Sequence, residues 1–431
     1  MSLPAVEEIR EITRGLLARL VGEARVRSAA RFLEELGWIS LSFSLARLIL
    51  GATSVLAASL LGPSEYGRFN LVMAVGPPIA TLMLCGMNAS ILQYGNRSEE
   101  ARPVFGTSFR IVAGGTLVAS LLVLVFGRRA AEAADLSPEI LWLGWVYAVA
   151  MTWYSLATSM QQAQRRFAAR GWTEILLASV TFTLFIAATR LYGASLRPVV
   201  WAYLAAYAVA VPAALVNLLS LIRTPALDPD RRRGLLTYGL YTFGCGAGSF
   251  LTSHFQTILL NALLSSRDVG VYSAHRVASI SMATFAVGTL HAVLFSRASA
   301  STNRWEMWGA LWRTWRWIFI PTLGAFCLAQ MLVLWLIGRT EFEASPGRIA
   351  LFALCATVVL LVSSLGQVVG AEGLRGARLG LALSLTMGGL SLLGSLILIP
   401  RWQIEGAVAS ITMSYAVGGI WLCCVSRRYC R

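Results

Sequence analysis

Two arginines, Arg47 and Arg276, lie inside otherwise apolar stretches of the chain. A guanidinium group stays charged at physiological pH, and its planar fork of donors matches the oxygens of a phosphate or a carboxylate. An arginine in the middle of a membrane span costs about 2.5–3.5 kcal/mol on insertion scales, so its side chain should face protein or water. These two positions are therefore the first candidates for binding an anionic ligand.

Small polar residues accompany Arg47 along the sequence. The set is Ser40, Ser44, Arg47, Gly51 and Ser54, spaced four, three, four and three residues apart. This spacing places them on one face of a helix. We interpret the stripe as the lining of a polar cavity. The alternative is a packing face of small residues, with Arg47 extended toward the membrane surface.

A second set of polar residues precedes Arg276. The apolar segment before it carries a similar stripe, formed by Tyr238, Thr242, Cys245, Ser249, Thr252 and Gln256. His254 is either a protonatable group in the same cavity or a hydrogen-bonded packing histidine. Arg276 shares a face with Tyr272 and Ser279, and its alternative role is an anchor at the lipid headgroups. The predicted substrate-binding residues are Arg47, Arg276, Ser44, Ser40, Gln256, His254 and Ser249.

Residue types that several enzyme classes require are missing. All 36 basic residues are arginines, which excludes the lysine of a P-loop and the lysine of Schiff-base chemistry. We find no mid-span carboxylate pair, HExxH or Ser/His/Asp constellation, and Glu174 and Glu372 are expected to face water or pair with arginines. The 7 scattered cysteines are predicted to be buried thiols, and 3 histidines are too few for a histidine-built metal centre. We therefore expect no catalytic residue, metal or cofactor.

The composition indicates what kind of chain holds these residues. Of 431 residues, 57% are hydrophobic and 13% are charged, and the mean hydropathy is +0.66. Soluble domains average about 45–50% apolar and about 25% charged residues, so the sequence predicts an all-α polytopic membrane protein. Segments of membrane-crossing length are predicted at 38–61, 69–93, 107–127, 139–161, 173–190, 198–222, 236–262, 270–295, 315–338, 349–371, 379–400 and 405–425.

The arginines between these segments predict an orientation. With the N-terminus inside, the internal segments hold 25 arginines and the external loops hold 9, as the positive-inside rule requires. Both termini are therefore predicted to be cytoplasmic. The predicted domains are an N-terminal segment (1–36) with an amphipathic stripe of Ile9, Ile12, Leu16 and Leu20, a six-helix lobe (37–222), a basic linker (223–235), a second six-helix lobe (236–426) and a tail (427–431).

One motif occurs twice, 203 residues apart. Residues 60–69 and 263–272 share the pattern LLxxx(D/E)xGx(F/Y), after the first and the seventh predicted span. Because six is even, two six-span lobes have the same topology and are related by an axis along the membrane normal. This predicts two pseudo-symmetric bundles around a central cavity that opens alternately to either side. Gly67 and Gly270 are each expected to form a tight turn.

Pro77 and Pro78 lie near the centre of the second predicted span. Proline removes an intrahelical hydrogen bond, so this span is predicted to be bent. We hypothesise that this bent span, beside the first span, forms a side opening for a lipid tail near Val75 and Ile79.

Several longer stretches resemble the polysaccharide transporter family. This is the Wzx-type flippase branch of the superfamily that also contains the MATE drug exporters and the lipid II flippase. The stretches are ASLLGPSEYGRFNLV, QTILLNALLSSRDVGVYSAHRVAS, VLFSRAS, LIGRTEF and LIPRWQIEGAVASI. Two positions depart from the family pattern, because Gln256 replaces an acidic residue and Ser296 replaces a proline.

The resemblance implies a MATE-like fold of about twelve helices in two bundles. It also implies that the chain carries an undecaprenyl-pyrophosphate-linked oligosaccharide across the bacterial inner membrane for surface or exported polysaccharide assembly. The implied partners are that lipid, the membrane lipids and assembly proteins such as a glycan polymerase, with no nucleic acid.

Three other functions remain as alternatives. A MATE-like, cation-coupled drug antiporter needs a carboxylate within the spans of a lobe, and the first span has none. A glycan polymerase or ligase needs a long external loop for the acceptor sugar, and the predicted external loops are short. A purely structural membrane protein has no use for two polar stripes.

Overall fold

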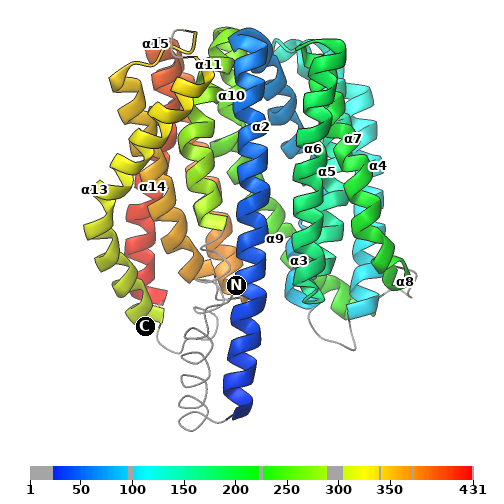
Figure 1. The fold of residues 1–431 in the computed structure, drawn as a ribbon. Coiled ribbons are helices and arrows are strands. Elements are labelled where there is room, and N and C mark those ends of the chain that lie inside the picture. Colours follow the sequence, from blue (N-terminus) through cyan, green and yellow to red (C-terminus); the bar gives the residue numbers. More distant parts are fainter. Residues whose placement is uncertain are drawn as a thin grey trace, which may run out of the picture.

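The computed structural model describes residues 23–95, 101–222, 227–288, 304–338, 341–370 and 373–429. Within these ranges the regular structure is helical, without a β-strand (Figure 1). Residues 1–22, which carry the predicted amphipathic stripe, lie outside the described residues, as do Ser296 and Glu372.

The long helices of the first lobe coincide with its apolar sequence segments. Its elements are α2 (Glu23–Leu84), α3 (Met87–Tyr94), α4 (Ala101–Ala133), α5 (Pro138–Ala163), α6 (Phe167–Tyr192), α7 (Leu196–Leu215), the 3-10 turn η1 (Val216–Leu218) and α8 (Leu219–Ile222). Helix α2 contains two spans, because Gly62 interrupts it with φ 68° and ψ 172°. A positive φ is accessible to glycine because it has no Cβ atom.

The second lobe repeats this plan. Its elements are α9 (Pro229–Ser253), α10 (Phe255–Leu263), α11 (Ser266–Arg276), the π-helical segment η2 (Val277–Ser281), α13 (Arg304–Ile337), α14 (Pro346–Gly370) and α15 (Gly373–Tyr429). Helix α15 also contains two spans, which are separated at Gln403.

The helices confirm the predicted number of crossings. Among the described residues, 8 helices are long and apolar enough to span a membrane. Two of them, α2 and α15, have the length of two crossings each, and α9 with α10 and α11 with η2 provide the remaining two. Helix α2 begins and α15 ends at the same end of the molecule (Figure 1), as an even number of crossings requires.

Three predicted boundaries shift. Helix α2 runs from Glu23 without a break at residue 36, and α9 starts at Pro229, inside the predicted linker. Span eight begins at Ser266 rather than at 270, because the Ser265 hydroxyl accepts a hydrogen bond from the Asp268 amide at 3.3 Å and caps the helix.

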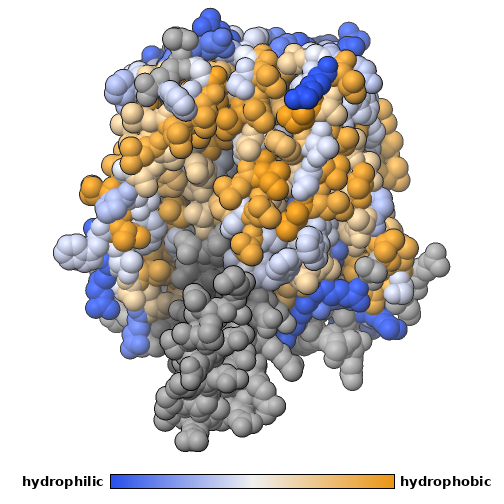
Figure 2. Space-filling view, viewed as in Figure 1, coloured by the Kyte–Doolittle hydropathy of each residue, from blue (hydrophilic) through white to orange (hydrophobic). Residues whose placement is uncertain are grey.

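The outer faces of both lobes are apolar. Large hydrophobic side chains are exposed on α4 and α13, among them Leu117 (63%), Val125 (66%) and Trp317 (84%). Figure 2 shows apolar side chains across the middle of the molecule and polar ones toward its two ends. Exposed hydrophobic surface of this extent is stable against lipid and not against water, so the chain is a membrane-embedded protein.

Candidate functional site

The first half of α2 has three distinct faces. Ser42, Ala46 and Thr53 are buried, and Gly171 of α6 lies directly against Ser42. Leu41, Leu45 and Leu48 are 62%, 44% and 68% exposed and face outward. At about 100° per residue, the stripe of Ser40, Ser44, Arg47, Gly51 and Ser54 lies on neither of these faces. Arg47 is therefore directed away from both the packed face and the most exposed apolar face.

Arg47 is exposed and lies beside a group of tyrosines. Its guanidinium lies near the side chains of Tyr147 and Tyr154 of α5. These two rings pack edge-on against Tyr207 of α7, with centroid distances of 5.7 Å and 5.5 Å. Arg47 has no hydrogen-bond or ion-pair partner in the part of the chain that the structure describes.

The nearby carboxylate is paired with a different arginine. Glu174 Oε1 lies 3.5 Å from Arg170 Nη2, and both side chains are largely buried. Arg170 also donates to the Thr158 carbonyl oxygen at 2.8 Å and lies over the Phe43 ring. The expectation that Glu174 pairs with an arginine is confirmed, and the pairing leaves Glu174 engaged with Arg170 rather than with Arg47.

Arg276 lies where the two lobes meet. Its guanidinium lies near Tyr66 of the first lobe and near Tyr272 and Tyr415 of the second. At 1.5 Å rise per residue, Arg276 lies about 15 Å from the start of α11, and Arg47 lies about 22 Å before the break at Gly62. Both arginines therefore lie inside continuous helical runs, well away from the ends of these runs. Like Arg47, Arg276 has no hydrogen bond or ion pair to a described residue.

The neighbouring His275 points into the core of the second lobe instead. It is fully buried, and its ring stacks on Phe352 with 5.1 Å between the ring centroids. Gln330 Nε2 can only donate, so it donates to His275 Nδ1 at 2.6 Å, and Nε2 of the ring donates to the Phe342 carbonyl oxygen at 3.2 Å. His275 is thus a hydrogen-bonded packing residue.

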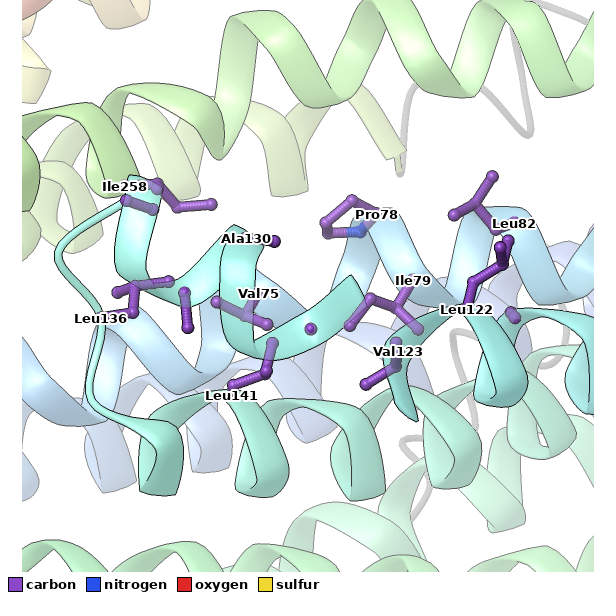
Figure 3. Close-up of a pocket in the computed structure, with 14 residues that line it drawn as sticks. Val75, Pro78, Ile79, Leu82, Leu122, Val123, Ala130, Leu136, Leu141 and Ile258 are labelled. Atoms are coloured by element: carbon purple, nitrogen blue, oxygen red, sulfur yellow. The ribbon is translucent and has the colours of Figure 1, made fainter. Parts of the chain in front are cut away.

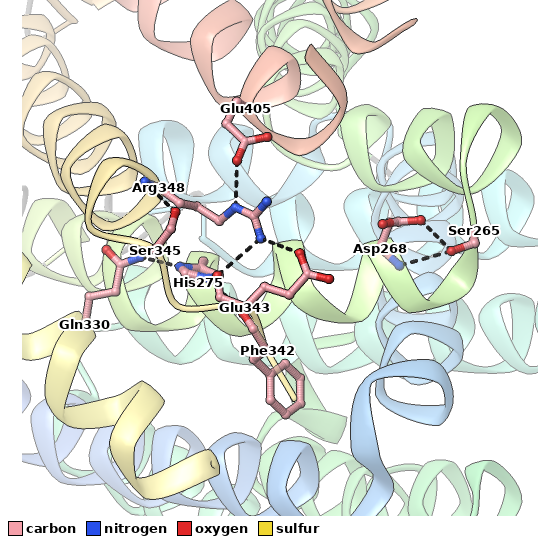
Figure 4. A network of polar contacts seen from close by, with 9 residues as sticks. All are labelled: Ser265, Asp268, His275, Gln330, Phe342, Glu343, Ser345, Arg348 and Glu405. Carbon is pink, nitrogen blue, oxygen red and sulfur yellow. Dashed lines mark hydrogen bonds and ion pairs between the residues drawn. The ribbon is translucent and has the colours of Figure 1, made fainter. Parts of the chain in front are cut away.

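Sequence reasoning missed an arginine that joins distant parts of the second lobe. Arg348, at the start of α14, donates to Glu405 at 2.8 Å and to Glu343 at 3.0 Å (Figure 4). Its side chain is only 12% exposed. Counting the arginines of the internal and external segments could not predict this contact, because Glu405 lies 57 residues from Arg348 in the sequence.

The other predicted site residues occupy different environments. Ser40 and Ser44 are half-buried on the α2 stripe, and Ser249 is exposed on α9. His254 is half-buried at the interruption between α9 and α10. The side chain of Gln256 is fully buried and donates to Ser391 Oγ at 2.5 Å. Gln256 joins α10 to α15 and is not accessible to a ligand in this structure.

The repeated motif contacts itself where the lobes meet. Gly67 lies inside α2 and Gly270 inside α11, and neither has a positive φ. The prediction that they form tight turns is therefore wrong. A Cβ atom on Gly67 would collide with the Ser266 carbonyl oxygen, and one on Gly270 would collide with the Pro63 carbonyl oxygen. The glycines are needed because the two backbones approach closely, which no other residue type permits.

Comparisons with known proteins give a family from the sequence and a fold from the structure. Residues 32–295 match the family model described as "Polysaccharide biosynthesis protein". A comparison with curated proteins found no match.

Three solved structures illustrate the fold. An inward-facing MATE multidrug resistance transporter of the MOP superfamily is 15% identical, with a TM-score of 0.68, and the match covers 91% of this chain and 94% of that one. The MATE multidrug transporter DinF-BH is 13% identical, with a TM-score of 0.64 and coverage of 92% and 95%. A MOP superfamily transporter from Pyrococcus furiosus, described by the reverse polarity of its binding pocket, is 14% identical, with a TM-score of 0.63 and the same coverage.

Because the sequence identity to these structures is so low, the structural similarity establishes only the fold. That fold is a MATE-like arrangement of helices. The family match is broader evidence, because it extends over more than half of the sequence and includes both copies of the repeated motif. The chain therefore belongs to the polysaccharide biosynthesis protein family of membrane proteins.

Proposed function

We propose that this chain moves an oligosaccharide linked to undecaprenyl pyrophosphate across the bacterial inner membrane, for surface or exported polysaccharide assembly. In this proposal Arg47 and Arg276 bind the diphosphate. The family supports a role in polysaccharide synthesis, and the fold supports a transporter rather than an enzyme. The observation that carries the proposal is that Arg47 in the first lobe and Arg276 in the second each lie inside a continuous helical run and have no ion pair with a described carboxylate.

The electrostatics favour an anionic ligand. A guanidinium group inside a membrane-spanning helix is costly without a counter-charge, and a diphosphate supplies several oxygens that can accept from its fork of donors. The hydroxyl groups of Ser40, Ser44 and Ser249 would then be available to hydrogen-bond the sugars. Transport would proceed by rocking of one lobe against the other, with the ligand held between them.

A cationic drug is a poorer ligand for the same residues. An unpaired arginine repels a cation, and the carboxylates of Glu174 and Glu405 are already paired with Arg170 and Arg348. These charges therefore do not favour the drug-antiporter alternative.

The test is export in a deletion strain that expresses single variants. We expect Arg47→Ala and Arg276→Ala to accumulate polyprenyl-linked oligosaccharide in the inner leaflet, measured by mass analysis, while the protein remains folded in the membrane. Arg190→Ala is the matched control, because Arg190 is an exposed arginine at the end of α6. Full export by both test variants would refute the role of these arginines.

A second measurement in the same strain separates a flippase from a polymerase. Loss of a flippase leaves single lipid-linked units in the inner leaflet, whereas loss of a polymerase leaves unpolymerised units that have already crossed the membrane. Accumulation of units in the outer leaflet would therefore overturn the proposed function.

A further inference from the structure

Phe342 of the second lobe places its ring in the contact between the lobes. Its side chain is fully buried, and the ring packs edge to face against Tyr66 of α2 with 6.4 Å between the centroids. Tyr66 is also fully buried, and its hydroxyl lies 2.9 Å from the hydroxyl of Ser54, a member of the polar stripe that includes Arg47. Phe342 is therefore packed against a fixed side chain of the opposite lobe.

The turn that carries Phe342 is held by two side chains of its own lobe. The next residue, Glu343, has φ 49°, which is uncommon for a residue other than glycine. Arg348 donates to the Glu343 carboxylate at 3.0 Å and to its carbonyl oxygen at 3.4 Å. Nε2 of His275 donates to the Phe342 carbonyl oxygen at 3.2 Å, while Gln330 holds the other ring nitrogen (Figure 4).

His275 and Arg276 occupy the same helical turn. Adjacent residues of a helix point about 100° apart, so a rotation of this turn that moves the His275 ring also moves the Arg276 guanidinium. Regular α-helix does not continue beyond it, because the π-helical segment η2 begins at Val277, and such segments are frequent at functional sites. Ser279 Oγ donates to the His275 carbonyl oxygen at 2.7 Å. The direction of Arg276 therefore depends on how His275 is anchored.

These contacts form a closed circuit through both lobes. The Arg276 guanidinium lies near Tyr66, Tyr66 meets the Phe342 ring, and the Phe342 carbonyl oxygen accepts from His275, which is the neighbour of Arg276 in the chain. Tyr66 is the one member that belongs to the first lobe. Separation of the lobes therefore removes Tyr66 from Phe342 and from Arg276 at the same time.

We propose that Phe342 is a latch that couples anion binding at Arg276 to closure of the lobes at the predicted external end, with His275 as the positioning residue between them. This inference rests on the proposed function. With Phe342 against Tyr66, the hydrogen bond to His275 holds Arg276 in its direction between the lobes. When the lobes part, Phe342 and His275 are released together and Arg276 loses that direction. The diphosphate is thus bound tightly while this end is closed and weakly once it is open.

The experiment measures affinity and lobe separation in the full chain in nanodiscs. The probe is a polyprenyl diphosphate, and spin labels at the exposed positions Arg190 and Arg401, one in each lobe, report the distance across this end. Because linkage is reciprocal, a ligand that binds the closed state more tightly must also shift the distances toward closure. We expect this shift in the labelled protein without further substitution. In Phe342→Ala we expect an affinity about tenfold lower and no shift. An unchanged affinity in folded Phe342→Ala would overturn the proposal.

Leu141→Ala is the matched control for loss of packing. Leu141 is buried like Phe342, and it lines an apolar pocket that α2, α4 and α5 form with Ile258 of α10 (Figure 3). Neither Phe342 nor His275 lines this pocket. Truncation of Leu141 should therefore leave the affinity and the shift unchanged. If Leu141→Ala and Phe342→Ala lower the affinity equally, the effect is general destabilisation and the latch is wrongly assigned.

Two variants of His275 separate positioning from packing. In His275→Gln the amide nitrogen reaches the place of the ring Nε2 and can donate to the Phe342 carbonyl oxygen. In His275→Asn the amide oxygen takes the place of Nδ1 and accepts from Gln330 only. We expect near-normal affinity and ligand-induced closure in His275→Gln, and about a tenfold loss of affinity in His275→Asn. Each variant keeps one buried hydrogen bond, so a purely structural role predicts equal effects, and equal affinities would overturn the role of His275.

The latch and the proposed function fail in different ways. If polyprenyl diphosphate binds in a manner that depends on Arg276, but leaves the distance between the lobes unchanged in every protein, the latch is refuted and the proposed function stands. If the protein without further substitution does not bind polyprenyl diphosphate, both proposals fall.

Discussion

Gly67 and Gly270 face each other across the contact between α2 and α11, and neither position has room for a Cβ atom. The contact is reciprocal. Gly67 lies against Ser266, which precedes Gly270 in the second copy of the motif, and Gly270 lies against Pro63, which precedes Gly67 in the first copy. It joins the lobes at the end that the sequence predicts to be external, and Tyr66 and Phe342 pack edge to face beside it at 6.4 Å. Opening of the molecule at this end must separate these two glycines.

Alanine at either glycine should weaken this contact. In Gly67→Ala and Gly270→Ala, the added methyl group collides with a backbone carbonyl oxygen that cannot move aside easily. We expect the lobes to separate at this end, measured as a longer distance between spin labels at positions 64 and 266. Gly114→Ala is the control, because nothing lies within 4 Å of a Cβ atom there. An unchanged distance distribution in both test variants would contradict the prediction.

A disulfide should hold the same contact closed. The hydroxyl oxygens of Ser64 and Ser266 are 3.4 Å apart, on opposite lobes. We expect the Ser64→Cys/Ser266→Cys protein to crosslink under mild oxidation, to lose transport, and to regain it when reduced. Each single cysteine variant is the control for oxidation elsewhere. Full transport by the crosslinked protein would show that this end need not open.

Removal of Arg348 should destabilise the second lobe. In Arg348→Ala, the carboxylates of Glu343 and Glu405 lose their shared partner, and Arg348 itself is largely buried. We expect a loss of about 1–3 kcal/mol in stability, seen as a lower midpoint of thermal unfolding in detergent. Arg128→Ala, which removes an exposed ion pair with Glu132, should have a much smaller effect. Equal midpoints for the two variants would contradict this role.

Gln256 should affect stability and not ligand binding. Gln256→Ala removes the hydrogen bond to Ser391 and leaves a buried hydroxyl without that donor, which costs about 1–2 kcal/mol. The affinity for polyprenyl diphosphate, measured in the folded protein, should stay unchanged, whereas Arg276→Ala should weaken it about tenfold or more. A large loss of affinity in Gln256→Ala would place this residue at the binding site after all.

The sequence alone was sufficient to predict the class of fold and the approximate positions of its crossings. A membrane span needs about 20 apolar residues and satisfies its backbone hydrogen bonds internally, so each can be recognised without knowing its neighbours. The short segment predicted at 173–190 illustrates this, since it lies within the continuous helix α6. The repeated motif likewise indicated two lobes of the same topology.

Only the tertiary structure decided which way the side chains point and what they contact. Arg276 and His275 are neighbours in sequence, yet one lies between the lobes and the other is buried with Gln330 and Phe352. Gln256 shared a polar stripe with Ser249, but α15 covers it and leaves Ser249 exposed. These outcomes depend on helices that pack from distant parts of the chain, and the pattern within a single span carries no information about them.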